Sequence, residues 1–413
     1  KINATVRIPG SKSYTNRALI TALLANGETV MKNALLSEDT RVMISCLGEL
    51  GIQVDVLTEE NTIRIKGCEG KIPVDRASLF ARNAGTVVRF MTAALTLGNG
   101  KYEIDGIERM RQRPIQQLID ALNHLGADVG SKEGTGCPPV LINACGLRGG
   151  TVNILGDISS QYISAILLTA PYASSDVRII VSDDLASKNY VDMTIDVMDR
   201  FGVDVERDSY KEFTVRSGQE YKGCEYMVEP DASGASYFFA AAAITGGKVR
   251  VEGLGDRSLQ GDTKFVDILG KMGCRTAKSQ DWLEVEGGEL RGIDVDMNET
   301  PDVVQTLAPV AAFAKGKTRI RNVKNLRYKE TDRITAIVNE LKKVGVEAIE
   351  FEDGIEIVPS PPHSAEISTY NDHRMAMSFS LLGLKTEGIR IKNPECVEKT
   401  FPDFFERLEK LYH

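Results

Sequence analysis

The stretch LGELGIQVDVL, residues 47–57, joins a helical pattern to a strand pattern at Gly51. A glycine there is typical of the left-handed position just after a helix, and the alternating apolar residues that follow are typical of a strand. The pattern returns as LNHLG from Leu122, MDRFG from Met198, LGKMG from Leu269 and LKKVG from Leu341, and in frayed form as LEKLY from Leu408. A spacing of about 70 residues predicts a repeated βαβ-type unit with extra strands.

A second pattern interleaves with the first and consists of alanine-rich segments that are apolar on nearly every face. We expect helices at residues 16–26, 87–97, 162–172, 237–245, 303–314 and 375–384. Helices without a polar face are buried, so these segments belong inside, and the charged helices that end in the glycine motif belong outside. The repeats therefore predict an α/β protein of two domains with three units each, in which sheets surround a core of helices.

The length and composition are those of a globular protein. At 413 residues the chain exceeds one core of ordinary size, which again predicts two domains. No apolar run reaches the roughly 18 residues that cross a bilayer, and we expect no secretory leader. The net charge of −8 argues against a nucleic-acid partner, although it allows a local cationic pocket.

Seven cysteines and four histidines are scattered along the chain, and no two cysteines form a C-x-x-C pair. Neither a structural zinc site nor a disulfide framework is expected from this pattern. We therefore expect a cytoplasmic protein that needs no metal.

Each expected buried helix is preceded by residues that are good helix N-caps. The stretches are SKSYTNR, RNAGTVVR, ISSQY, PDASGASY, ETPDVVQ and YNDHRM. One interpretation is that these residues only cap helices. However, the stretches also hold side chains that capping does not require, namely Lys12, Arg17, Arg89, Gln161, Asp302, His373 and Arg374. Because helix N-termini attract anions, and parallel buried helices would direct several of them to one place, the pattern predicts an anion-binding site.

A series of motifs resembles the EPSP synthase family of enolpyruvyl transferases. In chain order they are PGSKSYTNRALI, NAGTVVRF, RMRQRPI, SSQYISA, DASGASYFFAAAAI, QGDTKFVDILGKMG, NLRYKETDRI, YNDHRMAMSFSL and KTFPDFF. The resemblance implies transfer of the enolpyruvyl group of phosphoenolpyruvate (PEP) to the 5-hydroxyl of shikimate-3-phosphate, by addition and elimination through a tetrahedral intermediate, with release of phosphate. This reaction is a step of the shikimate pathway to chorismate and the aromatic amino acids, and it is the target of glyphosate.

The family fold is a two-domain inverse (inside-out) α/β barrel of six βαβαββ-type units, three per domain. The resemblance implies one domain of residues 9–226, with most of the shikimate-3-phosphate contacts. It implies a second domain of residues 1–8 and 227–413, with much of the PEP site, and an active site in the cleft between the domains. It implies no cofactor and no nucleic-acid or membrane partner, and we expect a monomer.

The resemblance also assigns the substrate contacts. The shikimate-3-phosphate site is expected to consist of Lys12, Ser13, Arg17, Ser159, Ser160, Gln161, Ser187, Asp302, Asn325 and Lys329. The PEP site is expected to consist of Lys12, Gly85, Arg113, Gln161, Arg333, Arg374 and Lys399. The substrates carry two phosphates and two carboxylates, and like charges near 4 Å repel by about 4 kcal/mol at an effective dielectric near 20, so cations are needed. Gly85 fits its role because a residue without a Cβ lets the backbone approach a ligand closely.

The implied chemistry needs a base at the 5-hydroxyl and an acid at the methylene carbon of PEP. Asp302 is the expected base. Glu330 is the expected proton carrier, with Lys12 as its competitor. Cations around Glu330 would lower the pKa of its carboxyl and burial would raise it, so the sequence leaves this balance open.

Several of these residues also have a purely structural interpretation. Glu330 and Arg333 could be an i, i+3 pair on a surface helix. Lys399 could belong to a turn before the last helix, and Asp231 and Ser233 could be caps only.

Two other functions are alternatives to this one. The first is UDP-N-acetylglucosamine enolpyruvyl transfer, in a family whose mobile loop usually carries a cysteine that GIERMRQRPI lacks. The second is a non-catalytic anion-binding relative, which the presence of Asp302 and Glu330 disfavours. The stretch VVRF, residues 87–90, departs from the family pattern behind Gly85 and bears on glyphosate sensitivity. Because Gly85 keeps the backbone approach open, we expect inhibition to persist.

Overall fold

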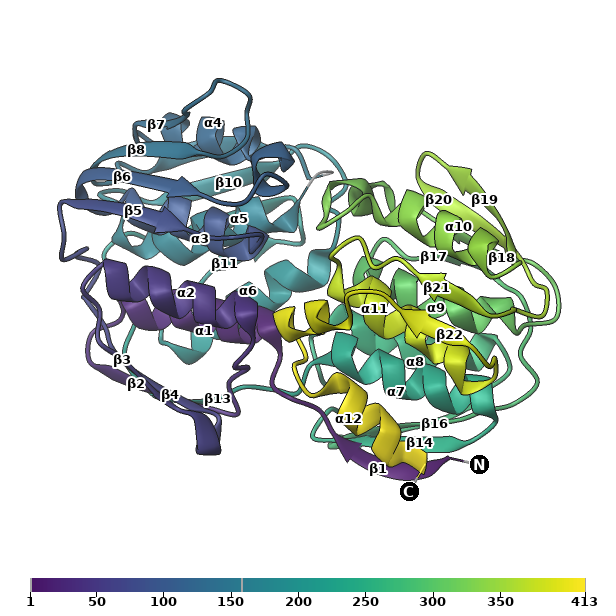
Figure 1. Cartoon of the computed structure of the whole chain (residues 1–413). Coiled ribbons are helices and arrows are strands. Elements are labelled where there is room, and N and C mark those ends of the chain that lie inside the picture. The colour runs from purple at the N-terminus through teal and green to yellow at the C-terminus, as the bar shows by residue number, and fades with distance from the viewer. Residues whose placement is uncertain (1, 157–158, 413) are drawn as a thin grey trace. The chain divides into compact units, whose positions relative to one another are not determined.

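The structure, a computed structural model, describes residues 2–156 and 159–412 (Figure 1). It divides into two compact units. We call Gly10–Val228 the N-terminal unit, and Lys1–Pro9 together with Glu229–His413 the C-terminal unit.

The domain limits predicted from the sequence differ little from this division. They were residues 9–226 for one domain and 1–8 with 227–413 for the other, within two residues of the observed limits. The assignment of each substrate to a domain stays a prediction. Ile158, the first residue of the quoted ISSQY stretch, lies outside the described residues.

The described part of the N-terminal unit has three four-stranded sheets that share one topology. Their strands are β2 (Glu28–Lys32), β3 (Val54–Leu57), β4 (Thr62–Lys66), β5 (Arg76–Phe80), β6 (Asn99–Asp105), β7 (Val129–Ser131), β8 (Val140–Cys145), β9 (Gly150–Ile154), β10 (Val177–Val181), β11 (Glu206–Asp208), β12 (Glu212–Val215) and β13 (Glu225–Met227). The sheets are β13–β2–β4–β3, β5–β6–β8–β7 and β9–β10–β12–β11. In each sheet the first pair of strands is parallel and the other two pairs are antiparallel.

Two kinds of helix alternate along the N-terminal unit. The buried helices are α1 (Lys12–Leu24), α3 (Gly85–Leu95) and α5 (Ser160–Thr169), and the half-exposed ones are α2 (Glu38–Glu49), α4 (Gln116–His124) and α6 (Lys188–Arg200). The buried helices are rich in Ala, Leu and Ile on every face, so they pack inside, whereas the others bury one stripe.

The C-terminal unit repeats this plan. Its strands are β1 (Asn3–Arg7), β14 (Lys248–Glu252), β15 (Arg275–Lys278), β16 (Trp282–Glu286), β17 (Asp294–Asp296), β18 (Thr318–Arg321), β19 (Glu347–Phe351), β20 (Gly354–Val358), β21 (Ala365–Ile367) and β22 (Ile389–Ile391). The sheets β1–β14–β16–β15 and β17–β18–β20–β19 have the topology of the N-terminal unit, and β21–β22 keeps only the parallel pair. The buried helices are α7 (Ala232–Thr245), α9 (Val304–Ala312) and α11 (His373–Ser380), and the others are α8 (Phe265–Lys271), α10 (Arg333–Lys343) and α12 (Phe404–Glu409).

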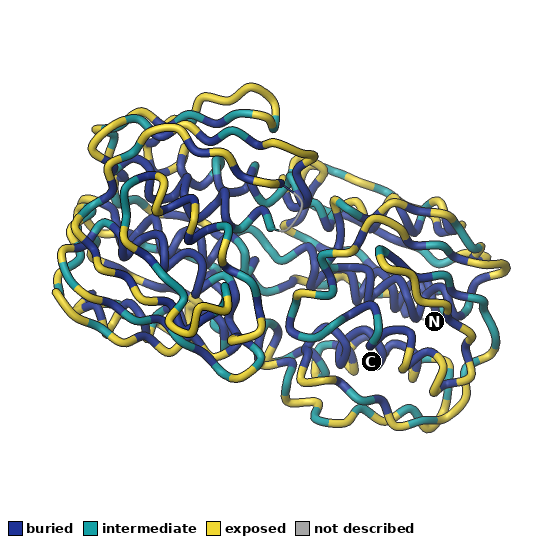
Figure 2. The backbone as a smooth tube through the Cα atoms, turned by 90° about the horizontal axis from the view of Figure 1, so that it is seen from above, coloured by how far each residue is buried: buried dark blue, intermediate teal, exposed yellow. Residues whose placement is uncertain are grey.

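The prediction of an inside-out α/β fold with three repeats in each half is confirmed by this arrangement. In Figure 2 the buried backbone lies inside each unit and the exposed segments lie on its outside. The sixth repeat, which the frayed LEKLY motif ends, is the reduced one. None of the described helices has the length and apolar character needed to cross a membrane.

The glycines of the repeated motif terminate the outer helices as predicted. Gly51, Gly126, Gly202, Gly273 and Gly345 have φ angles between 77° and 106°. Residues other than glycine rarely adopt this left-handed backbone conformation. The glycine therefore lets the chain leave the helix and enter the next strand.

The predicted starts of several buried helices were wrong. The expected ranges 16–26 and 237–245 omit the first turns of α1 and α7, which begin at Lys12 and Ala232. The reason is capping. The side chains of Ser11 and Asp231 accept hydrogen bonds from backbone N–H groups of these turns, so the residues that follow them belong to the helix. Lys12 and Ser13 therefore lie in the first turn of α1, and Ser233 lies in the first turn of α7.

Candidate functional site

Arg17, on the buried helix α1, is a cation enclosed by neutral groups. The residue is 2% exposed. Its Nε donates to Thr194 Oγ1 at 2.7 Å, Nη1 donates to the Ser13 carbonyl at 3.0 Å, and Nη2 donates to the Tyr190 carbonyl at 3.0 Å and to Ser164 Oγ at 3.4 Å. Burial lowers the pKa of Arg17 to about 10. No carboxylate in the described part of the chain forms an ion pair with it, so its charge is held by neutral groups there.

Thr194 and Ser164 were not predicted from the sequence, although they hold the Arg17 guanidinium. Thr194 Oγ1 donates to Ser164 Oγ at 2.8 Å, so the two hydroxyls form one pair beneath Arg17. The available signal was helical spacing. Ser164 lies four residues after Ser160 on α5, and Thr194 lies four residues after Tyr190 on α6, so each shares a helix face with a residue near the predicted site.

A second cluster of cations surrounds the start of helix α3. A Cβ built on Gly85 would lie 2.4 Å from Arg89 Nη1 and 2.5 Å from Arg113 Nη2, so both guanidinium groups contact the bare backbone. Arg89 Nη1 donates to Gln161 Oε1 at 3.2 Å, and Arg113 Nη1 donates to the carbonyl of Asn83 at 3.0 Å. The first turn of α3 therefore lies between two buried arginines, which gives it a strong attraction for anions.

The other predicted residues of the N-terminal unit lie at helix starts. Ser159 is the N-cap of α5 and accepts the Gln161 backbone N–H at 3.3 Å, and Ser160 follows it, buried, in the first turn. Ser187 precedes α6 with a left-handed φ of 57°. Lys12 is the first residue of α1, and its Nζ lies 3.3 Å from a carboxylate oxygen of Asp39. Capping thus accounts for Ser159, and it is compatible with a ligand at the same helix terminus.

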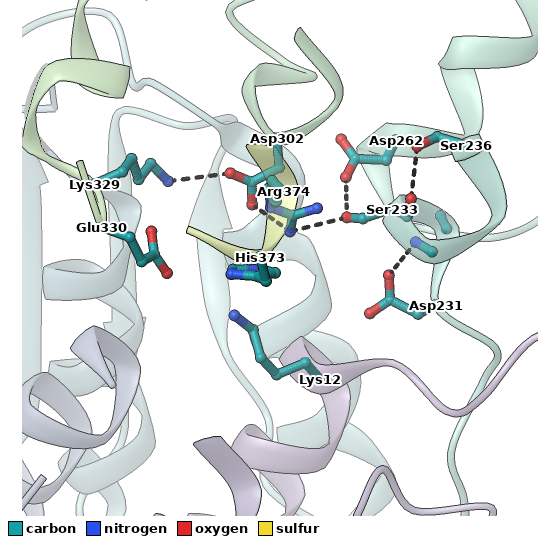
Figure 3. A network of polar contacts seen from close by, with 12 residues as sticks. Lys12, Asp231, Ser233, Ser236, Asp262, Asp302, Lys329, Glu330, His373 and Arg374 are labelled. Atoms are coloured by element: carbon teal, nitrogen blue, oxygen red, sulfur yellow. Dashed lines mark hydrogen bonds and ion pairs between the residues drawn. The ribbon is translucent and has the colours of Figure 1, made fainter. Parts of the chain in front are cut away.

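In the C-terminal unit, three cations hold the carboxylate of Asp302. This residue lies in the short helix η5 (Pro301–Val303), directly before α9. Its Oδ1 is 3.1 Å from Arg333 Nη1 and 3.5 Å from Lys329 Nζ. Its Oδ2 is 3.3 Å from Arg374 Nη2, and Figure 3 shows Lys329 and Arg374 contacting the two oxygens. A carboxylate that forms ion pairs with three cations has a fixed orientation.

Arg333, the first residue of α10, is the centre of this network. It is 1% exposed, and it bonds to Asp372 at 2.8 Å and to Glu330 at 2.9 Å in addition to Asp302. Burial alone would lower the pKa of Arg333, but Asp372, then Glu330 and Asp302, raise it, so the group stays charged. The i, i+3 pair of Glu330 with Arg333 exists, but the interpretation as a surface pair is wrong because both residues are buried.

Two further residues of this network were missed by sequence reasoning. Asp372 is the N-cap of α11 and accepts the backbone N–H of Arg374 at 2.9 Å. Asp262 is buried and accepts a hydrogen bond from the Ser233 hydroxyl. Burial raises the pKa of Asp262 to about 7, and the charge of Asp302 adds to this shift. Ser233 is therefore more than a cap, since Asp231 caps α7 and the Ser233 hydroxyl contacts Asp262.

The remaining predicted residues are at least partly buried near helix starts or ends. Asn325 lies in η6 (Lys324–Tyr328), and its Oδ1 is buried without a hydrogen-bond partner in the described structure. Lys399 ends η8 (Pro394–Lys399) and is 5% exposed, which is not expected of a residue in a simple surface turn. His373 is fully buried, with Nδ1 3.5 Å from Asp372 Oδ1.

Contacts therefore join the predicted residues into separate clusters within each unit. In the N-terminal unit, Arg17 and Ser13 form one cluster, and Gly85, Arg113 and Gln161 form another. In the C-terminal unit a single network joins Asp302, Lys329, Glu330, Arg333 and Arg374. The described residues contain no group of three or more His, Cys, Asp or Glu side chains that could hold a metal ion.

Comparisons with known proteins point to one family. The model of the family described as EPSP synthase (3-phosphoshikimate 1-carboxyvinyltransferase) matches residues 1–408. A 3-phosphoshikimate 1-carboxyvinyltransferase of Trichormus variabilis is 47% identical over 411 residues, 99% of this chain and 96% of the relative. One of Shewanella piezotolerans is 48% identical over 415 residues, 100% of this chain and 97% of the relative.

Solved structures agree with the fold. The structure of EPSP synthase from Acinetobacter baumannii is similar with a TM-score of 0.82 at 27% identity, over 99% of this chain and 96% of that one. The enolpyruvyl transferase NikO from Streptomyces tendae has a TM-score of 0.81 over 100% of this chain and 95% of its own. At 18% identity NikO supports the fold alone.

Proposed function

The chain belongs to the EPSP synthase family, the 3-phosphoshikimate 1-carboxyvinyltransferases, and we propose that the clusters described above carry out the reaction of that family. It transfers the enolpyruvyl group of PEP to the 5-hydroxyl of shikimate-3-phosphate and releases phosphate. The relatives from Trichormus variabilis and Shewanella piezotolerans both carry this activity in their names, and nothing favours UDP-N-acetylglucosamine as the acceptor or a non-catalytic role.

The observation that carries the mechanism is the carboxylate of Asp302 held by three cations. A base at the 5-hydroxyl needs a fixed orientation, and Arg333, Arg374 and Lys329 provide it. As the hydroxyl oxygen bonds to C2 of PEP, Asp302 accepts the hydroxyl proton. This role is supported by the position of Asp302 at the start of a buried helix, where anionic substrates are attracted.

Glu330 is the proposed proton carrier at C3 of PEP. Arg333 bonds to both Glu330 and Asp302, so one guanidinium orients the proposed acid and the proposed base. The tetrahedral intermediate then loses phosphate as the C2–O bond to phosphate breaks, and a methyl proton returns to the carrier. Arg333 and Arg374 stabilise the departing phosphate. Lys12 remains the competing carrier.

Shikimate-3-phosphate is proposed to bind at the helix starts of the N-terminal unit. Arg17 is suited to the carboxylate or a hydroxyl of the shikimate ring because it has no ionic partner in the described chain. Ser159 and Ser160 open helix α5, where backbone N–H groups and hydroxyls attract the 3-phosphate. Ser13, Ser187, Asn325 and Lys329 complete this proposed site.

PEP is proposed to bind at Gly85, Arg113, Gln161, Arg333, Arg374 and Lys399, with Lys12 between the two substrates. Arg89 donates a hydrogen bond to the amide oxygen of Gln161. The amide N–H groups of Gln161 are therefore proposed to donate to the ligand. The two arginines beside Gly85 provide charge, and the missing Cβ gives a ligand access to the backbone.

The change Gly85→Ala is expected to raise the KM for PEP by about tenfold or more, because the new Cβ displaces the Arg113 guanidinium from its position. Wild-type enzyme is expected to be inhibited by glyphosate with an inhibition constant near that KM, and the variant should raise this constant too. Steady-state kinetics would measure both values.

Gly130→Ala is the matched control for this change, since a Cβ at Gly130 meets no atom within 4 Å. It should leave both constants at their wild-type values. Equal constants in the Gly85 variant and wild type would contradict the assignment of the PEP site.

The proposed function is tested by mixing the protein with its substrates and measuring inorganic phosphate. Release is expected with PEP and shikimate-3-phosphate together and with neither alone. Replacing shikimate-3-phosphate by UDP-N-acetylglucosamine should give no release. Phosphate release with UDP-N-acetylglucosamine would favour the UDP-N-acetylglucosamine enolpyruvyl transferase. No release with either acceptor would favour a non-catalytic binding protein.

We also propose that the chain is a monomer in the cytoplasm. All seven cysteines belong to the described residues and are free thiols, which suits a reducing compartment. Light scattering coupled to size-exclusion chromatography measures the oligomeric state, and a mass near 45.2 kDa is the expected result.

A further inference from the structure

Asp262 is a buried carboxylate that the proposed mechanism does not use. It lies in η4 (Gly261–Lys264), just before α8, and is 6% exposed. The Ser233 hydroxyl donates to Asp262 Oδ2, and Ser233 Oγ in turn accepts a hydrogen bond from Arg374 Nη2 at 3.4 Å. Figure 3 shows the resulting chain of contacts from Asp262 through Ser233 and Arg374 to Asp302.

Arg374 consequently has a carboxylate on each side. Asp302 contacts it directly at 3.3 Å, and Asp262 is linked to it through Ser233. Asp302 is also held by Arg333 and Lys329, so ionisation of Asp262 would add a negative charge that is linked to Arg374 through Ser233. An anionic substrate at Arg374 would be repelled by this added charge, which disfavours its binding.

The other ionisable groups near Asp262 do not neutralise this added charge. Asp231, the N-cap of α7, adds a third negative charge, and the Tyr237 hydroxyl of α7 is neutral because burial raises its pKa to about 12. Lys264, on the same short helix as Asp262, forms its ion pair with the surface residue Glu299. In α8, the side chain of Asp267 pairs at the surface with Lys278.

Protonation of Asp262 removes this added negative charge. Burial raises its pKa, and the charge of Asp302 raises it further, so the carboxyl exchanges its proton with water near neutral pH. The Ser233 hydroxyl is a neutral partner that can bond to the protonated or the ionised carboxyl by turning its hydrogen. The link to Arg374 is therefore kept in both states.

We propose that Asp262 is a positioning residue for PEP that orients the Arg374 guanidinium through Ser233. In the PEP complex Asp262 is protonated, so the positive charge of Arg374 is available to the substrate. The inference rests on the proposed function, in which Arg374 binds PEP. By linkage, PEP binding draws a proton from water onto Asp262 once the pH is high enough to ionise it in the free enzyme.

The test is the KM for PEP at saturating shikimate-3-phosphate between about pH 6 and about pH 8.5, a range that spans the titration of a group near neutrality. Asp262→Asn retains the hydrogen-bonding shape and cannot ionise. The ratio of the wild-type KM to the KM of this variant should rise by about tenfold across the range. The titration of PEP itself cancels in the ratio, and the corresponding ratio of kcat values should stay flat.

Ser233→Ala is the second variant. It removes the hydroxyl that joins Asp262 to Arg374 and leaves the Asp262 carboxyl in place. It should raise the KM for PEP by about fivefold at every pH, because Arg374 loses one orienting bond. Asp256→Asn, an exposed residue shortly before η4, is the matched control and should follow wild type. Fluorescence of the single tryptophan, Trp282, reports whether the C-terminal unit of each variant is folded.

A KM ratio that is constant with pH, or a Ser233→Ala enzyme with the wild-type KM, would overturn the inference. Failure of the proposed function has a different signature. In that case Arg374→Gln itself would leave the KM for PEP unchanged, whereas the proposed function requires it to rise.

Discussion

Asp302→Ala is expected to lower kcat by about 10³-fold, because the 5-hydroxyl loses the base that accepts its proton. Asp302→Asn should lower kcat to a similar extent, since the amide keeps the size of the side chain and has no basic oxygen of comparable strength. Phosphate release at saturating substrates measures the effect. In Asp294→Ala, a surface carboxylate paired with Arg321 is removed, and this control should leave kcat unchanged.

Glu330→Gln addresses the other half of the proton transfer. A loss of about 10²-fold in kcat is expected if Glu330 carries the proton to C3 of PEP. Near wild-type turnover in either the Asp302 or the Glu330 variant would show that the role assigned to that residue is wrong. Activity retained in Glu330→Gln and lost in Lys12→Met would assign the proton to Lys12 instead.

The second large effect concerns stability. Arg333→Met should lower the free energy of unfolding of the C-terminal unit by about 3–5 kcal/mol, because it leaves buried carboxylates without their counter-charge. The carboxylates concerned are Asp372, Glu330 and Asp302. Urea unfolding followed by Trp282 fluorescence measures the change, since this tryptophan lies on β16 of the same unit.

Arg321→Met is the matched control, because Arg321 pairs with Asp294 at the surface of the same unit. Exposed pairs contribute about 0–1 kcal/mol, so the loss should be small. The deficit of Arg333→Met should also shrink as the pH falls towards 4, since protonation removes the uncompensated charges. A deficit below about 1 kcal/mol at neutral pH would contradict the view of Arg333 as the centre of the network.

The repeats could be predicted from the sequence because each is marked by residues whose effect on the backbone or on burial is local. Gly51 and its four counterparts mark helix ends through a backbone conformation that belongs to glycine, whatever the surroundings. All-round apolar segments identify the buried helices in the same direct way. The starts of α1 and α7 were placed too late because the polar and small residues of their first turns, Lys12–Thr15 and Ala232–Ser236, were assigned to the stretches before the helices.

The site was only partly predictable, for a physical reason. Arg17 and Asp302 stand out in the sequence because they occur close to expected helix starts, where capping does not need them; in the structure Arg17 lies in the second turn of α1. Thr194 and Asp262 have no such local signal: Thr194 acts because α6 packs beside α1, and Asp262 acts because its loop meets the first turn of α7. Roles that arise from the approach of distant segments cannot be read from either segment alone.

The most direct test of the account is a crystal structure of the protein with shikimate-3-phosphate and glyphosate bound. The central claim is that the helix starts of both units supply the charges that hold two anionic substrates. We predict that the shikimate ring contacts Arg17, that its 5-hydroxyl lies within hydrogen-bond distance of Asp302, and that glyphosate contacts Arg333 and Arg374. Ligands bound away from these side chains, or a 5-hydroxyl out of reach of Asp302, would contradict it.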